Sequence, residues 1–540
     1  MSFIKAQKIV RDSHGVIKSG SASLVDAVYD TGRHTGHSRH AVRERLGKVL
    51  HLSADGKSGI FLSPTRGLVE YTSTTDMFAS VDSGDPRIPA WARPPVTEIH
   101  TVFGDTYLLL LFLEKCGLLG VLQGIFQKKE ELERVLAHIL HGVIRDGSRI
   151  TCDAFLGKSF ASYLLSDLPY ASLKSDSRFF ASLGADAVKV AFFRSFVAGM
   201  RKRNPRFGKG CYVDSTPLPN DIGDNPFNAL CCHGVGLSEV MTRLVLVLDE
   251  ASGLPVWYDI IPGNVLDINT VMATVNDVAA TLDVEIDSLV LDAGYVSKEL
   301  LEAFHIGSEK TIIGRMPARK GFPYKNLYWE VKDLIGKGKY TFVRKGHAYF
   351  GCRKEVELFG KREYAYVYVD KYNALKRVSD YLTEHEEEFE ALKMKDKDWT
   401  MVKYGYFVLL SNIDTTPKEL LGQYFGRTDI EVVFKTSKEY LDLLPLSKWT
   451  DQTVRGKILH DIIDTITLLL LRKEFSNSGV STTELFGRAQ ALMCFRDKEG
   501  NVTVETPTRQ LKEYYGKLKM EIPSRVRLSQ FAERILGQKL

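Results

Sequence analysis

The chain has 540 residues, which at about 150 residues per domain predicts three or four folding units. Hydrophobic residues make up 44% and charged residues 26% of the chain, which excludes disordered, collagen-like and coiled-coil classes. The net charge of +5 is too small by itself to indicate a polyanionic partner.

The cysteines and the apolar runs predict the cellular compartment in which the protein works. Seven cysteines contain no C-x2-C pair, which argues against a disulfide scaffold or a structural zinc site and favours a reducing environment. The first ten residues lack the apolar region of a signal peptide. The longest apolar run, 108–122, is broken by Glu114 and Lys115, too early for a membrane span. We therefore expect a cytoplasmic protein with no membrane partner.

Residues 1–95 predict a small N-terminal domain of mixed secondary structure that ends in the proline-rich linker 86–96. The first 60 residues carry ten Lys and Arg against five Asp and Glu, so this region is a candidate for binding DNA ends. The alternative is ordinary solvated surface. His34, His37 and His40 lie three apart, but without a nearby cysteine a metal site is the less favoured interpretation.

Residues 96–205 predict a helical domain, because apolar side chains recur at helical spacing over 107–122, 132–144 and 188–200. This domain closes in a basic segment: Arg194 to Lys209 holds six basic residues and no acidic one.

From residue 206 the pattern changes to strands. Five are expected, at residues 211–216, 241–250, 254–263, 287–294 and 311–314. Helical patterns follow the third strand, at 270–282, and the fourth, at 297–304. Three antiparallel strands, a helix, a strand, a helix and a further strand are similar to the first part of a ribonuclease-H-like α/β sheet, which we place at 206–314.

Residues 315–405 predict a β-rich insertion into that sheet. Strands are expected at 340–343, 348–350, 356–359 and 364–370, followed by a charged helix near 378–395. Residues 315–346 carry nine basic and two acidic side chains.

The strand 404–412 then opens the second part of the core, 406–475. Thr416, Pro417 and Glu419 predict a capped helix start there. The C-terminal region 476–540 is mixed and basic.

Two aspartates lie on apolar strands. Asp214 follows Tyr-Val in CYVDST, and Asp292 ends LVLD before Ala-Gly-Tyr. A carboxylate in such a place is disfavoured by strand propensity and by desolvation unless something compensates for it. Strand ends are also where active sites form. For Asp292 alone, the start of a turn before Gly294 is an equally good interpretation.

Residues 424–438 contain a polar stripe. If they form one helix, the spacing of Tyr424, Arg427, Glu431 and Lys438 places them on a single face. Gly426 weakens this interpretation, because a break there would detach Tyr424. The alternative is an exposed face on which Arg427 and Glu431 form an i,i+4 ion pair.

Taken together, YVDST, PGNVLD, LDAGYVS and Y-x2-R-x3-E-x6-K resemble the DDE transposases of bacterial insertion sequences. The resembling subgroup carries its catalytic glutamate in the last signature and has a β-rich insertion in its ribonuclease-H-like core. The resemblance covers about residues 205–475. It implies an α/β fold with a ribonuclease-H-like mixed sheet interrupted by that insertion, preceded by a helical domain and a small mixed N-terminal domain.

The resemblance also implies roles for individual residues. Asp214, Asp292 and Glu431 would form the catalytic, metal-binding triad, with two Mg²⁺ ions or Mn²⁺ as a substitute. Tyr424, Arg427 and Lys438 would bind the backbone of the transposon-end DNA near the cut. Asn264 and Asp267, in PGNVLD, match a shared motif for which a structural or supporting role is expected.

The implied activity is metal-dependent cleavage at transposon ends and transfer of the freed 3′-hydroxyl into target DNA. A homodimer on paired ends, associated with the bacterial nucleoid, would carry it out. Two other functions stay open: a nuclease with the same core that never joins DNA, and a DNA-binding relic of a transposase without catalysis.

Overall fold

The computed structural model divides the chain into two compact units, Met1–His100 with Phe495–Asp497, and Thr101–Cys494 with Lys498–Leu540. The described residues are those of 2–537 outside 30–37, 83–84, 90, 93–99, 146–148, 166–172, 221, 223–224, 232–238, 266–269, 428–430, 432, 434, 437–445, 447 and 498–499. Side chains are also left undescribed at 29, 38–39, 149, 173–175 and 427.

The first unit is an antiparallel sheet whose six strands follow one another in chain order. The strands are β1 (Ser2–Arg11), β2 (Ile17–Tyr29), β3 (Ser38–Leu52), β4 (Ser58–Ser63), β5 (Gly67–Thr72) and β6 (Met77–Ser80). Leu24, Leu46, Phe61 and Tyr71 form its buried centre. Mixed secondary structure was predicted for residues 1–95. The described part of this region contains strands and no helix.

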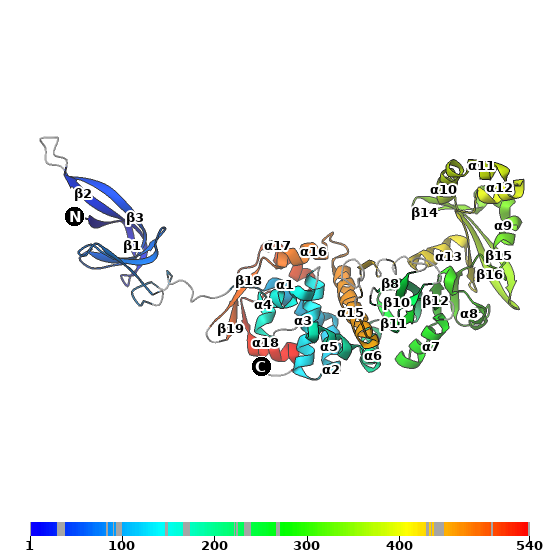
Figure 1. The fold of residues 1–540 in the computed structure, drawn as a ribbon, viewed down its shortest axis with the longest axis horizontal. Coiled ribbons are helices and arrows are strands. Elements are labelled where there is room, and N and C mark those ends of the chain that lie inside the picture. Colours follow the sequence, from blue (N-terminus) through cyan, green and yellow to red (C-terminus); the bar gives the residue numbers. More distant parts are fainter. Residues whose placement is uncertain are drawn as a thin grey trace. The chain divides into compact units, whose positions relative to one another are not determined.

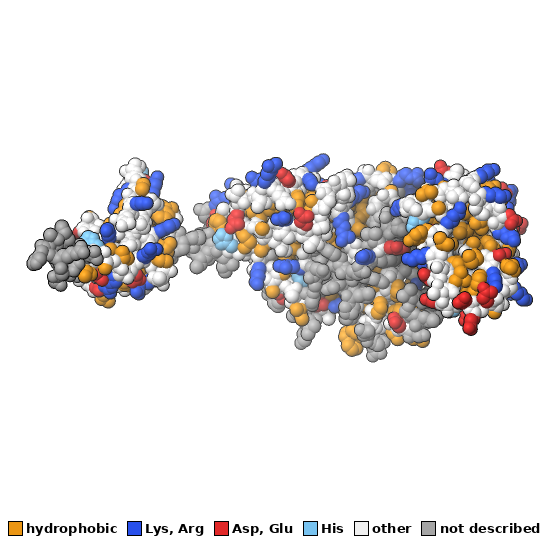
Figure 2. Space-filling model, turned by 90° about the horizontal axis from the view of Figure 1, so that it is seen from above, with side chains coloured by type: hydrophobic (Ala, Val, Ile, Leu, Met, Phe, Trp, Pro, Cys, Tyr) orange, Lys and Arg blue, Asp and Glu red, His pale blue; other side chains and the backbone are white. Residues whose placement is uncertain are grey.

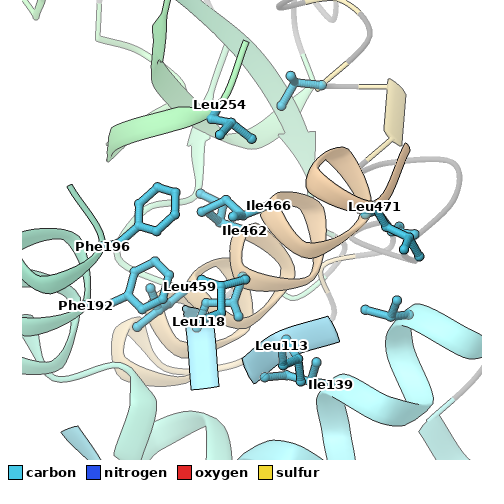
Figure 3. Close-up of a cluster of buried hydrophobic side chains, with 14 of the residues drawn as sticks. Leu113, Leu118, Ile139, Phe192, Phe196, Leu254, Leu459, Ile462, Ile466 and Leu471 are labelled. Atoms are coloured by element: carbon cyan, nitrogen blue, oxygen red, sulfur yellow. The ribbon is translucent and has the colours of Figure 1, made fainter. Parts of the chain in front are cut away.

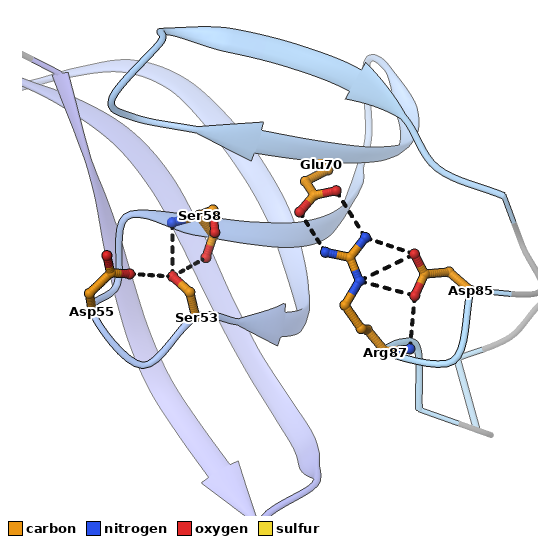
Figure 4. Close-up of polar contacts among 6 residues, drawn as sticks. All are labelled: Ser53, Asp55, Ser58, Glu70, Asp85 and Arg87. Carbon is orange, nitrogen blue, oxygen red and sulfur yellow. Dashed lines mark hydrogen bonds and ion pairs between the residues drawn. The ribbon is translucent and has the colours of Figure 1, made fainter.

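Ion pairs and turn hydrogen bonds hold the segment after β6 and the β3–β4 turn against this sheet (Figure 4). Arg87 pairs with Glu70 on β5 and with Asp85, each at 2.7 Å. The hydrogen bonds from Arg87 lower the pKa of Asp85 to about 2. The Ser53 hydroxyl donates to Asp55 at 2.7 Å and closes the β3–β4 turn.

In the second unit, helices occupy most of residues 104–203, within the region where a helical domain is expected. These helices are α1 (Gly104–Cys116), α2 (Leu118–Ile125), α3 (Lys129–Ile144), α4 (Cys152–Gly157), α5 (Leu173–Leu183) and α6 (Asp186–Arg203). Among the described residues, no single helix is long and apolar enough to cross a membrane, although α1 and α2, bent by 84°, pass that test as a pair.

A later helix, α15 (Asp451–Phe475), completes this helical domain. It is buried on nearly all sides, and Leu459 and Ile462 face Phe192 and Phe196 of α6 (Figure 3). At Gly456 an added Cβ would lie 1.7 Å from the Phe180 carbonyl oxygen of α5. Glycine therefore lets α15 and α5 approach backbone to backbone.

The central sheet has ten strands in the order β11-β10-β8-β12-β13-β17-β16-β15-β14, with β9 beside β10. Its first strands are β8 (Gly210–Pro219), β9 (Ala229–Leu230), β10 (Val240–Asp249), β11 (Pro255–Pro262), β12 (Ser288–Leu291) and β13 (Thr311–Arg315). Helices α7 (Val271–Leu282) and α8 (Lys298–Ala303) connect them. The five strands and two helices predicted for 206–314 are thus confirmed. β12 runs parallel to β8 and β13, and the other paired strands are antiparallel.

The insertion extends the core sheet instead of forming a separate one (Figure 1). Its strands are β14 (Thr341–Arg344), β15 (His347–Leu358) and β16 (Lys361–Asp370), which reach the core through β17 (Tyr406–Ser411). The separate strands expected at 348–350 and 356–359 are one strand, because Gly351 leaves room for Phe342 and Pro417 without ending the strand.

The insertion also carries helices. They are α9 (Tyr324–Val331), α10 (Lys371–Glu384), α11 (Glu386–Ala391) and α12 (Met394–Thr400). The single charged helix expected near 378–395 is therefore broken at His385 and between residues 391 and 394.

The C-terminal region joins the helical domain. Its elements are α16 (Thr482–Ala489), β18 (Met493–Arg496), β19 (Asn501–Val504), α17 (Arg509–Lys517), β20 (Arg525–Arg527) and α18 (Leu528–Leu536). Its strands form a small sheet with β7 (Thr101–Val102), in the order β20-β19-β18-β7.

Glu363, on β16, is a fully buried carboxylic acid (0% exposed) with no hydrogen-bond partner among the described residues. Burial raises its pKa from 4.5 to about 8. Between those two pH values the folded state binds more protons than the unfolded state, so the free energy of unfolding falls as the pH rises. We expect Glu363→Gln to gain stability relative to the wild type between pH 5 and pH 9, measured as a rising difference in the urea midpoint.

The control is Glu357→Gln, an exposed glutamate on β15. Its urea midpoint should differ from that of the wild type by the same amount at every pH. If the urea midpoints of Glu363→Gln and the wild type change in parallel with pH, burial does not raise the pKa of Glu363 and the prediction is wrong.

Candidate active site

Asp214 lies on β8, and Asp292 directly follows the neighbouring parallel strand β12. Val213 of β8 is in register with Leu291 of β12, and each aspartate is the next residue along its chain. Adjacent strands lie about 4.8 Å apart, so we expect the two carboxylates to be neighbours where β12 ends beside β8. Both side chains are half-buried, and one Asp214 oxygen accepts a hydrogen bond from the Ser215 backbone N–H at 2.8 Å.

Tyr424 reaches the same place from a helix. It is the last residue of α13 (Pro417–Tyr424), and its hydroxyl donates a hydrogen bond to Asp292 Oδ1 at 3.2 Å. The helix starts with the predicted capping box: the Thr416 hydroxyl accepts from the Glu419 N–H, and the Glu419 side chain accepts from the Thr416 N–H. Because the helix start is fixed in this way, Tyr424 is positioned beside the aspartates.

The prediction of one continuous helix face for residues 424–438 is wrong at its start. α13 ends at Tyr424, and residues Phe425–Arg427 form a 3₁₀ turn, η7. An added Cβ at Gly426 would lie 2.1 Å from the Tyr212 hydroxyl oxygen, so the turn depends on a glycine at this contact. Tyr212 and Asp214 point to the same face of β8, which places η7 over the face that carries Asp214.

The remaining predicted residues are Glu431, Arg427, Lys438, Asn264 and Asp267. Glu431 is exposed on a helical stretch, which is anchored by buried Val433 and by a 2.8 Å hydrogen bond from Arg472 of α15 to the Thr436 hydroxyl. Its approach to the two aspartates stays a prediction. Three further predicted positions lie outside the described residues: the side chain of Arg427, Lys438 and Asp267. Asn264 is exposed in the turn after β11.

The donor set of the two aspartates suits a hard divalent cation, because carboxylate oxygens are the ligands that Mg²⁺ prefers. Two half-buried carboxylates on adjacent strands also repel each other unless positive charge is near. A divalent cation between the two aspartates would supply that positive charge.

A second group of possible metal ligands lies on α15. Single ligand atoms of His460, Asp461 and Asp464 lie within 4.8 Å of one another, and all three side chains are buried. However, Lys457 Nζ lies 3.3 Å from Asp461 Oδ2, and His460 Nδ1 lies 3.3 Å from an oxygen of each aspartate. The lysine already supplies positive charge, so we interpret this group as a buried ion-pair network that stabilises the helical domain.

The structure adds residues to the site that the sequence analysis did not select. Tyr212 and Gly426 meet across 214 positions of chain, and no spacing rule connects them. Phe425 faces the β14–β15 turn of the insertion, where Arg344 lies over its ring. The only sequence signal for that turn is the excess of basic residues in 315–346.

Comparison with known families identifies the class of protein. A family model described as a transposase DDE domain matches residues 206–482, just over half of the chain, and spans both aspartates, Tyr424 and the insertion. The chain therefore belongs to the DDE transposase domain family.

No curated protein matches the chain. Among solved structures, the chain is similar to a cryo-EM structure of the piggyBac transposase synaptic complex with hairpin DNA, at a TM-score of 0.34 and 9% sequence identity. The similarity covers 81% of this chain and 85% of that one.

Proposed function

We propose that this transposase cleaves DNA at transposon ends and transfers the freed 3′-hydroxyl into target DNA. The observation that carries the proposal is that Asp214 and Asp292 directly follow a paired couple of residues, Val213 and Leu291, on parallel neighbouring strands within the region that the family model matches. Two carboxylates brought together from positions 78 residues apart suit metal-dependent phosphoryl transfer. The substrate would be the ends of its own element, a bacterial insertion sequence.

In this proposal Asp214, Asp292 and Glu431 hold two Mg²⁺ ions, or Mn²⁺ in their place. Bound ions would supply activation of the attacking oxygen and stabilisation of the leaving 3′-oxygen. The Tyr424 hydroxyl orients the Asp292 carboxylate through its 3.2 Å hydrogen bond. Tyr424, Arg427 and Lys438 would also hold the DNA backbone, since a guanidinium can bind a phosphate through two hydrogen bonds and an ammonium adds a mobile charge.

The element order supports a ribonuclease-H-like core for this chain. Strands β11, β10 and β8 are antiparallel neighbours, and β12 and β13 continue the sheet in parallel with β8. The insertion between β13 and β17 agrees with the subgroup whose core is interrupted by β-structure. A homodimer on paired DNA ends, working in the cytoplasm at the nucleoid, is part of the same proposal.

We also propose that the first unit binds transposon-end DNA. Its sheet places Lys5 and Arg45 on either side of Ser23, and Lys48 beside Ser21. Among the described residues, none of these three cations forms an ion pair, and the small serines leave room between them. Duplex DNA presents a row of phosphates that such a surface can contact. On the visible face of each unit, Figure 2 shows acidic side chains among the basic ones.

In the decisive experiment, the purified chain is incubated with Mg²⁺ and with labelled DNA duplexes. The duplexes are taken from the DNA that flanks the gene of this protein. We expect nicks at the element ends, dependent on Mg²⁺ and abolished by EDTA, and joined products when pre-cut ends are supplied with target DNA. Cleavage without joining would indicate the nuclease alternative. Binding without cleavage or joining would indicate the non-catalytic alternative.

A further inference from the structure

An open cavity of about 200 Å³ lies between the insertion and the end of α13. It is lined by Arg344, Lys345, His347, Tyr349 and Phe425. The first four belong to the β14–β15 hairpin, and Phe425 opens η7. Since Phe425 directly follows Tyr424, whose hydroxyl reaches Asp292, this β14–β15 cavity neighbours the candidate active site.

The aromatic walls hold the Arg344 guanidinium in place. It lies over the Phe425 ring at 5.0 Å from the centroid, and its Nη2 donates to the Gly422 carbonyl oxygen at 3.4 Å. Tyr349 is buried and packs against Phe425 at 6.2 Å between ring centroids. An arginine that is stacked on an aromatic ring loses less side-chain entropy when it binds an anion.

The cavity carries positive charge that is not neutralised by the described part of the chain. Neither Arg344 nor Lys345 forms an ion pair with a described residue, and Lys345 is exposed at the hairpin turn, where Lys345 and Gly346 both have positive φ. The nearby carboxylate, Asp370, is occupied: it pairs with His347 at 3.1 Å and caps α10. Burial and Asp370 raise the pKa of Tyr349 to about 12, so this hydroxyl stays neutral.

We propose that the β14–β15 cavity binds a backbone phosphate of the DNA strand that runs through the candidate active site. Arg344 would contact the phosphate oxygens from its fixed place on Phe425, and Lys345 would add a mobile charge from the rim. The insertion would thereby position DNA for the aspartates, although it contributes no carboxylate to them. This inference rests on DNA as the substrate of the proposed function.

The test measures binding of a fluorescein-labelled duplex from the DNA flanking the gene, in EDTA, across a range of KCl concentrations. Each phosphate contact contributes about 0.9 to the slope of log affinity against log salt. We expect Arg344→Ala and Lys345→Ala each to weaken binding about five- to tenfold and to lower the slope by about 1. Arg344→Lys should keep the slope, because it keeps the charge.

The matched control is Lys361→Ala, the first residue of β16, which pairs with Leu358 at the far end of β15. It should leave affinity and slope at the wild-type values. A double variant, Arg344→Ala with Lys345→Ala, that binds with an unchanged slope would overturn the phosphate site. Because EDTA prevents metal-dependent cleavage, this result is independent of whether the chain cuts DNA. Failure of the proposed function would appear differently, as a wild-type chain that does not cut the ends of its own element in Mg²⁺.

Discussion

Asp292→Asn is expected to abolish cleavage of end DNA, with a loss of about 10³-fold or more, as for removal of a group that stabilises transition-state charge. Asparagine keeps the size of the side chain and an oxygen that can accept the Tyr424 hydrogen bond. It removes the negative charge that divalent ions need. Asp214→Asn should have the same effect, since each aspartate directly follows one residue of the paired couple Val213 and Leu291. The measurement is the rate of nicking of a labelled end duplex in Mg²⁺.

Binding of the same duplex in EDTA should persist in both variants, which separates catalysis from folding and from DNA contact. Asp277→Asn, at an exposed position on α7, is a matched control that should cleave at the wild-type rate. Glu431→Gln tests the third carboxylate by itself. If that variant cleaves normally while the two aspartate variants do not, the third metal ligand is a different residue. Normal cleavage by Asp292→Asn would overturn the assignment of the site.

The second large effect is expected in the helical domain, where Asp461→Ala should lower the free energy of unfolding by about 3–5 kcal/mol. Asp461 is fully buried, and Lys457, which pairs with it at 3.3 Å, is only 5% exposed. Removing the aspartate leaves an ammonium in an apolar environment with one charge partner fewer. The measurement is the urea midpoint of the full chain at pH 7, followed by the circular dichroism of its helices.

Two comparisons make this prediction specific. Glu131→Ala breaks the exposed pair with Lys128, whose side chains are 80% and 50% exposed, and should cost less than about 1 kcal/mol. Lys457→Met combined with Asp461→Leu should recover most of the stability, because apolar residues can replace a buried ion pair. An Asp461→Ala variant as stable as Glu131→Ala would mean that the network does not support the fold.

Local patterns in the sequence predicted most elements of the second unit. Apolar residues at helical spacing predicted α1, α2, α3 and α6 but neither α4 nor α5, and short apolar runs predicted β8, β10, β11, β12 and β13. The capping box at Thr416 was also predictable, since it depends on residues three positions apart. Errors arose where a distant contact overrides local preference. Gly351 continues β15 where two strands were expected, and the side chains that require glycine there, Phe342 and Pro417, come from elsewhere in the chain. The break that Gly426 suggested is present, since α13 ends at Tyr424.

The order of the motifs in the amino-acid sequence, through its resemblance to the DDE transposases, predicted that Asp214, Asp292 and Tyr424 belong to one site, because motifs are local and can be read along the chain. Only the folded chain revealed that β8 and β12 pair in parallel directly before the two aspartates, and that the insertion continues the core sheet through β17. It also placed Arg344 of that insertion over Phe425. Strand pairing and side-chain packing join residues that are far apart in the chain, and their free energy depends on the whole arrangement, which no short segment encodes.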